Sequence, residues 1–130
     1  KIKYPSSLKA TKADPLVKLV LWCNPHNPSG RMWTEEELKR VAEIVEKHNL
    51  WLISDEIHCD IIRNGRKHIP MGQVMPDYGK LITCMSASKT FNMAGLHSSC
   101  SIIPNPEYKK RQEASLREAW LMSPNCLSIH

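Results

Sequence analysis

The stretch Ser86-Ala-Ser-Lys89-Thr-Phe-Asn-Met-Ala-Gly95 follows directly on the apolar run Lys80-Leu-Ile-Thr-Cys-Met85. This run is short, apolar and rich in branched side chains, which predicts a buried strand over 81–86. Lys89 therefore lies just past the carboxyl end of a strand, the edge at which ligands bind in open α/β sheets. A lysine amine in a partly desolvated pocket loses its proton more readily and can form a Schiff base with an aldehyde.

A second apolar run, Leu16-Val-Lys-Leu-Val-Leu-Trp22, predicts a strand over 16–22. It leads into Cys23-Asn-Pro-His-Asn-Pro-Ser-Gly30, where two Asn-Pro steps and a closing glycine predict a rigid turn. Such a turn can hold Asn27 as a fixed amide donor. Asn24 is the alternative donor, but its proline neighbour favours a role in forming the turn.

An acid stands at the end of a third predicted strand, over 50–55. Leu50-Trp-Leu-Ile-Ser54 leads into Asp55, and His58 follows three residues later. An Asp beneath a pyridine ring keeps the ring nitrogen protonated, so that the ring acts as an electron sink. Together with a lysine suited to a Schiff base, this acid indicates pyridoxal phosphate. Asp55 could instead cap a turn, and His58 could hydrogen-bond a loop carbonyl.

The order of these elements predicts an α/β fold. Thr34-Glu-Glu-Glu37 is a capping box that starts a helix over 35–48, and Asn49 can end that helix in the left-handed conformation. The helix joins strands 16–22 and 50–55 as a parallel crossover, which should be right-handed.

The second half of the chain predicts a different connection. A loop-rich link with one helical turn over 70–76 precedes strand 81–86, and Ser98-Ser-Cys-Ser-Ile-Ile103 predicts a fourth strand. The turn between these strands is too short for a parallel crossover, so the fourth strand should be antiparallel. A helix over 106–122 follows. The expected sheet is mainly parallel with one antiparallel strand, in the order 16–22, 50–55, 81–86, 98–103, and carries helices on its faces.

The three loop motifs, in this order and at these separations, resemble those of the fold-type I pyridoxal-phosphate enzymes, the aspartate aminotransferase superfamily. Within it they are most similar to the cystathionine β-lyase (C–S lyase) branch of MalY/PatB type, from about Asp14 to Pro124. The resemblance implies that Lys89 is the catalytic residue and carries the internal aldimine, and that Asp55 pairs with the pyridine nitrogen. It also implies that Asn27 donates to the phenolic oxygen of the ring.

His58 falls where most aminotransferases of this superfamily place a tyrosine, and its ring can also reach the phenolic oxygen, which favours the lyase branch. The resemblance further implies that Ser86 and Ser88 hold the phosphate. Many members place an arginine eight residues after the lysine as a bidentate phosphate clamp, but this chain has His97 there. A neutral imidazole gives at most one hydrogen bond, so the phosphate should depend more on hydroxyls, backbone N–H groups and residues outside this chain.

The length of the chain limits what it can do alone. At ~100–200 residues per domain, 130 residues are at most one domain, and the family's subunit is roughly three times this length. We therefore expect residues 1–130 to be the central part of the large, cofactor-binding domain, without the N-terminal segment and the C-terminal small domain. The family's carboxylate-binding arginine then lies outside the chain, and the isolated chain should be inactive.

The composition fits a cytoplasmic protein. Hydrophobic residues make up 42%, and no apolar run approaches the ~20 residues of a membrane span. The cysteines are scattered and odd in number, which indicates reduced thiols: Cys23, Cys59, Cys84, Cys100 and Cys126. Cysteine–histidine neighbours could be imagined as zinc ligands, but none has the spacing of a zinc site, so we expect no metal. The net charge of +5 is spread over helix faces without a nucleic-acid-binding signature.

The resemblance predicts a pyridoxal-phosphate-dependent carbon–sulfur β-lyase of amino-acid metabolism. It would act on cystathionine- or cysteine-type amino acids and give ammonia, pyruvate and a thiol. The full-length enzyme is expected to be a homodimer whose partner is its small amino-acid substrate, without nucleic acid or membrane. Two alternatives stay open: a pyridoxal-phosphate-dependent aminotransferase, and a catalytically inactive structural fragment.

Overall fold

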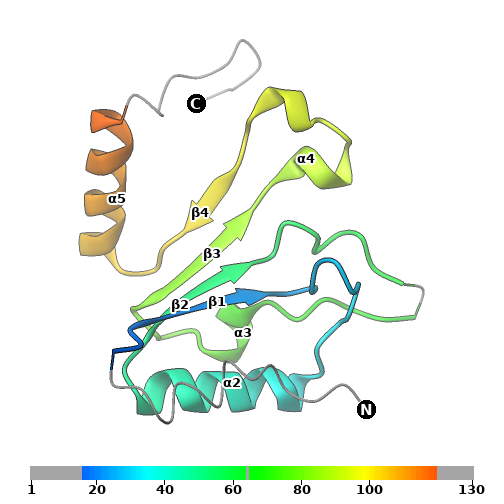
Figure 1. The fold of residues 1–130 in the computed structure, drawn as a ribbon, viewed down its shortest axis with the longest axis horizontal. Helices are drawn as coiled ribbons and strands as arrows, with labels where there is room; N and C mark the ends of the chain where they lie inside the picture. The colour runs from blue at the N-terminus through cyan, green and yellow to red at the C-terminus, as the bar shows by residue number, and fades with distance from the viewer. Residues whose placement is uncertain (1–15, 64, 120–130) are drawn as a thin grey trace.

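Residues 16–63 and 65–119 are described by the computed structural model, and they form a four-stranded sheet flanked by helices (Figure 1). The strands lie in the order β1 (Leu19–Cys23), β2 (Trp51–Asp55), β3 (Leu81–Met85) and β4 (Cys100–Ile102). The first three are parallel, and β4 is antiparallel to β3. The predicted strand order and the antiparallel fourth strand are both confirmed.

Helix α2 (Glu35–Lys47) connects β1 to β2 and begins as predicted. Thr34 Oγ1 accepts a hydrogen bond from Glu37 N at 3.3 Å, and Glu37 Oε2 accepts one from Thr34 N at 3.0 Å. Three glutamates in the first turn add negative charge at the positive end of the helix dipole. After the helix, Asn49 adopts φ 52°, the left-handed conformation expected there.

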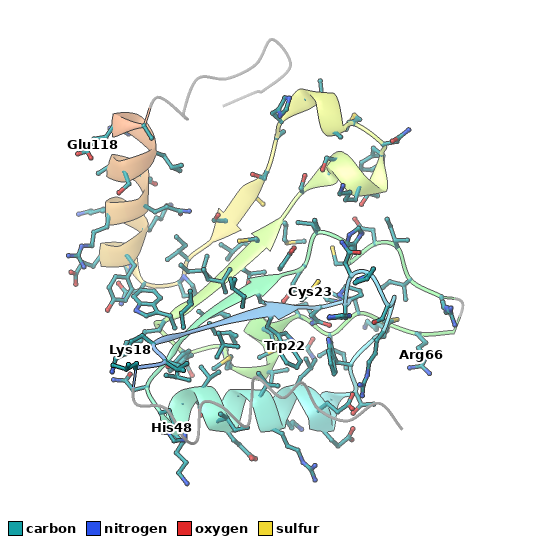
Figure 2. All side chains as sticks on the ribbon, in the orientation of Figure 1. Lys18, Trp22, Cys23, His48, Arg66 and Glu118 are labelled. Atoms are coloured by element: carbon teal, nitrogen blue, oxygen red, sulfur yellow. The ribbon has the colours of Figure 1, made fainter. Side chains whose placement is uncertain are left out.

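One face of the sheet packs against α2, and Figure 2 shows side chains filling the space between them. Alternation along the strands directs Trp22, Leu52 and Leu81 to this face, where all three are buried. The helix supplies the opposite wall of the core through Leu38, Val41, Ala42 and Val45. The rings of Trp22 and Trp33 lie 4.5 Å apart, so this core extends beneath the carboxyl end of β1.

The described residues cover the opposite face of the sheet only in part. Helix α5 (Pro106–Glu118) lies on this side, away from α2 in Figure 1. The Trp51 and Tyr108 rings are 4.5 Å apart, and Gln112 Nε2 donates to Ser101 Oγ at 3.2 Å. Towards β1 the face is open, since Leu21 is 73% exposed.

Several element boundaries differ from the prediction: β2 begins one residue late, at Trp51, and α2 ends one residue early, at Lys47. β1 begins at Leu19, three residues late, because the register with β2 starts at the Leu19–Trp51 pair. β3 ends at Met85, because Ser86 caps the short helix α4 (Ala87–Thr90). β4 is limited to Cys100–Ile102 by its register with β3, and the predicted end of the last helix lies outside the described residues.

The link between β2 and β3 contains α3 (Met71–Val74), which confirms the single helical turn predicted over 70–76. Met71 is fully buried against the α2 core. No helix within residues 16–63 and 65–119 is both long enough and apolar enough to cross a membrane.

Candidate active site

The carboxyl ends of β1, β2 and β3 meet at one edge of the sheet, because these strands are parallel (Figure 1). At this edge Asp55 is paired in register with Cys23 of β1 on one side and with Cys84 of β3 on the other. Asn24 N donates to the Asp55 carbonyl at 2.9 Å, so the loop after β1 stays in contact with the end of β2. The loops that carry Asn27 and Lys89 therefore leave the sheet on either side of Asp55.

Asp55 lies on the face of the sheet opposite α2, because its neighbour Ser54 is buried toward the helix. Its Oδ1 accepts a hydrogen bond from Ile57 N at 3.2 Å, which limits the rotation of the carboxylate. Burial raises the pKa of the Cys84 thiol, and the negative charge of Asp55 acts in the same direction. The carboxylate thus lies near Cys84, on the face that remains open towards β1.

The loop after β1 is a tight hairpin. His26 N donates to the Arg31 carbonyl at 2.8 Å, Gly30 N donates to the His26 carbonyl at 2.8 Å, and Gly30 has φ 65°. Asn24 is buried, and its Nδ2 donates to the Ile69 carbonyl at 2.9 Å, so this amide is used within the protein. Asn27 is exposed, and its side chain has no hydrogen-bond partner among the described residues.

Asn27 and His58 line one cavity of about 210 Å³ between the two loops. His58 Nε2 is buried, yet it has no hydrogen-bond partner among the described residues. Buried polar atoms in folded proteins are nearly always hydrogen-bonded, so an unpaired ring nitrogen on a residue that lines a cavity is a candidate ligand contact. The structure thus brings together Asn27 and His58, the two residues predicted to contact the phenolic oxygen of the cofactor.

Lys89 lies just past the carboxyl end of β3, as predicted, and is the third residue of the short helix α4. The residue is exposed, and its amine has no partner among the described side chains and carbonyls. The next residue, Thr90, donates from Oγ1 to Asp60 Oδ2 at 2.8 Å. The turn that carries Lys89 is thereby joined to the loop after β2.

The two predicted phosphate-binding hydroxyls are already engaged. Ser86 Oγ accepts from Ser88 N at 3.1 Å and lies 2.7 Å from both Ser88 Oγ and the Ser98 carbonyl oxygen. One hydroxyl proton serves only one acceptor, so Ser86 must release the Ser98 carbonyl before it can donate to a phosphate. His97 is exposed and has φ 49°.

Sequence reasoning missed a buried acid next to Asp55. Glu56 is only 1% exposed, and its Oε1 accepts from Ser54 Oγ and from Met71 N, both at 2.9 Å. Its Oε2 lies 2.7 Å from His68 Nε2. The alternation of β2 directs position 56 to the same side as the buried Ser54, and this signal was available in the sequence. No signal in the sequence indicated that His68, in the link between β2 and β3, is its partner.

The described cysteines are free. Cys23, Cys59 and Cys84 are half-buried, and Cys100 is exposed. Burial raises the pKa of the Cys59 thiol, and the charges of Asp60 and Glu56 raise it further. Within residues 16–63 and 65–119, no group of three His, Cys, Asp or Glu side chains is placed to hold a metal ion.

Known proteins resemble this chain along most of its length. The family described as Aminotransferase class I and II matches residues 5–126. Cystathionine beta-lyase PatB of Bacillus subtilis is 40% identical over 123 residues, which are 94% of this chain and 32% of that protein. Protein MalY of Escherichia coli is 37% identical over 123 residues, which are 94% of this chain and 31% of that protein.

A solved structure has the same fold. The PLP-bound C-S lyase from Staphylococcus hominis matches with a TM-score of 0.80 and 47% sequence identity, covering 85% of this chain and 28% of that chain. The mainly parallel sheet with its antiparallel fourth strand is therefore the fold found in that enzyme. The chain spans about a third of the length of the curated relatives it matches.

Proposed function

The chain belongs to the aminotransferase class I and II family, and from this premise we propose that its parent protein is a pyridoxal-phosphate-dependent carbon–sulfur β-lyase. Its substrate would be a cystathionine- or cysteine-type amino acid, which is split into ammonia, pyruvate and a thiol. The names of the relatives support this choice: PatB is a cystathionine beta-lyase, and the Staphylococcus hominis structure is a PLP-bound C-S lyase.

The observation that carries the proposal is the cavity shared by Asn27 and His58. Asn27 and His58 line the same space beside the strand end that holds Asp55, and among the described residues neither the Asn27 amide nor His58 Nε2 has a hydrogen-bond partner. Two such groups can contact one ligand oxygen, such as the phenolic oxygen of pyridoxal phosphate. The residues present therefore fit this cofactor.

In this proposal Lys89 Nζ is the attachment point, and Asp55 faces the ring nitrogen. Asn27 and His58 hold the phenolic oxygen, while Ser86 and Ser88 contribute to the phosphate site once Ser86 releases the Ser98 carbonyl. Bound pyridoxal phosphate supplies an electron sink for the substrate's α-carbon.

The residues of this chain then have distinct tasks. Asp55, held by Ile57 N, keeps a proton on the ring nitrogen. His58 Nε2 and the Asn27 amide fix the rotation of the ring. When it is not bonded to the cofactor, Lys89 Nζ would accept the substrate's α-proton as a general base. The electron pair left at the α-carbon would then form a double bond to the β-carbon, and the sulfur would leave as a thiolate.

Two incubations of the full-length protein test this function. With cystathionine alone, a lyase releases ammonia, pyruvate and a thiol in equal amounts. The second candidate, an aminotransferase, is favoured by the family to which the chain belongs. It would instead transfer the amino group to a supplied 2-oxo acid without releasing a thiol. Absence of both reactions, with no bound cofactor, would contradict the proposal and favour a structural role.

The proposal extends to the whole protein. Residues 1–130 would be the central part of the large domain of a cytoplasmic homodimer, and the isolated chain would have no turnover. The chain's share of the relatives' length and the open sheet face at Leu21 support this placement. Sedimentation of the full-length protein at twice the subunit mass is the expected result, and a monomer with full activity would contradict it.

A further inference from the structure

The helix that carries Lys89 is too short and too exposed to be stable by itself. α4 has four residues, none of them buried, and an isolated single turn of helix is unstable in water. Phe91, directly after it, is 66% exposed, so apolar packing among the described residues does not anchor this end. The direction in which Lys89 points must therefore be set by polar contacts at the two ends of the turn.

Those two contacts come from different parts of the chain. At the start of α4, Ser86 Oγ accepts from Ser88 N and, as long as it does not donate to a phosphate, donates to the Ser98 carbonyl, which joins the turn to the segment before β4. At its end, Thr90 Oγ1 donates to Asp60 Oδ2 at 2.8 Å. Lys89 is the neighbour of Thr90, so this second bond lies next to the proposed attachment point.

Asp60 belongs to a loop that is itself fixed. The loop begins at Glu56, whose side chain is held in the core by Ser54 and Met71. Within it, Cys59 N donates to the Glu56 carbonyl at 2.9 Å. The Asp60 side chain is exposed, and as an ionised acceptor it forms a stronger hydrogen bond than a neutral oxygen does.

We propose that Asp60 is a positioning residue, which acts through Thr90 to hold Lys89 at a fixed place relative to Asp55 and His58. This inference rests on the proposed function. It adds that the loop after β2 provides ring contacts and also aligns the lysine of the neighbouring strand end. Neither Asp60 nor Thr90 needs to touch the cofactor for this role.

A double-mutant cycle in the full-length protein tests the proposal. Asp60→Ala and Thr90→Val each remove the same hydrogen bond, so each should weaken pyridoxal phosphate binding by about three- to tenfold. Each should also lower the visible absorbance of lysine-bound cofactor per cofactor retained. The double variant should be no worse than the worse single variant, because only one bond is lost. Thr90→Ser, which keeps the hydroxyl, should restore both values.

Two controls separate positioning from general damage. Thermal unfolding of the cofactor-free variants shows whether the fold is weakened, and Thr90→Val preserves the shape of the side chain. The exposed Glu35–Lys39 ion pair on α2, at 2.6 Å, is the matched control, and its double alanine variant should leave cofactor binding unchanged.

Binding and absorbance within twofold of wild type in both single variants would overturn the proposal. So would losses that multiply in the double variant, since the two residues would then act separately. If the unaltered full-length protein binds no pyridoxal phosphate, the proposed function fails and this inference fails with it. Normal cofactor binding by the unaltered protein that the Asp60 variants do not change would instead refute this inference alone.

Discussion

The two faces of the sheet differ in how completely residues 16–63 and 65–119 cover them. On the α2 face, Leu52 and Leu81 are at most 1% exposed, and the helix closes the core without help from outside. On the other face, Leu19 and Leu21 are 45% and 73% exposed, and α5 covers only the side towards β4. Asp55 belongs to this second, open face. One face therefore provides the stability of the sheet, while the other carries a proposed ligand contact.

The largest effect is expected at the open edge. In the full-length protein, Lys89→Ala should lower turnover of cystathionine by several orders of magnitude, because the residue is both attachment point and base. Visible absorbance from lysine-bound cofactor should disappear. Stability should change little, since Lys89 is exposed and without a partner among the described residues.

Steady-state kinetics, absorbance spectra and thermal unfolding of the cofactor-free protein check the three parts of this prediction. Turnover within tenfold of wild type would remove Lys89 from its proposed role. Lys109→Ala on the exposed surface of α5 is the matched control and should leave turnover unchanged.

A substitution on each face sharpens the comparison. Leu52→Ala opens a cavity in the α2 core and should lower the free energy of unfolding of the 130-residue chain by about 2–5 kcal/mol. Leu21→Ala removes the same atoms from the open face and should change it by less than about 0.5 kcal/mol. Urea unfolding measures both. Equal losses would mean that the second face is also packed within this chain.

The parts of the fold that form the two faces differ in how well the local sequence predicts them. The strand order, the antiparallel fourth strand and the Thr34–Glu37 capping box were predictable, because they follow from local periodicity, turn length and residue spacing. The start of β1 was not, since apolar side chains continue to Leu16 while the register with β2 begins only at Leu19.

Some features of the candidate site could likewise be predicted from the sequence, and others could not. The motifs predicted which residues leave the carboxyl edge, and the structure places Asn27 and His58 on one cavity. The pairing of Glu56 with His68 could not be predicted, because their contact forms only when the link folds back on the sheet. The Asp60–Thr90 bond was hidden for the same reason, since 30 residues separate its partners.

Glu56 joins the stable face to the site, and its loss should have a moderate effect. In the core, the Glu56 carboxylate contacts Ser54, Met71 and His68. Glu56→Gln replaces one carboxylate oxygen with an NH₂ group, so one of these buried contacts becomes unfavourable. The free energy of unfolding should fall by about 1–3 kcal/mol. Urea unfolding checks this, with Glu43→Gln on the exposed face of α2 as control. An unchanged value would show that the buried carboxylate does not stabilise the link.

The smallest effect concerns the start of α2. Thr34→Ala removes the side-chain acceptor for Glu37 N and should destabilise the chain by about 1 kcal/mol, without altering cofactor binding by the full-length protein. Thr34→Ser keeps the acceptor and should recover most of the loss. A Thr34→Ala variant with weakened cofactor binding would mean that the stable face and the site are not separable.

The location of the cofactor tests the central claim most directly. Borohydride treatment of the full-length protein with bound pyridoxal phosphate makes the lysine linkage permanent, and peptide mass spectrometry then identifies the modified residue. The account predicts the pyridoxyl group on Lys89 and on no other lysine of this chain. Modification of a different lysine, or of none in protein that has bound the cofactor, would contradict it.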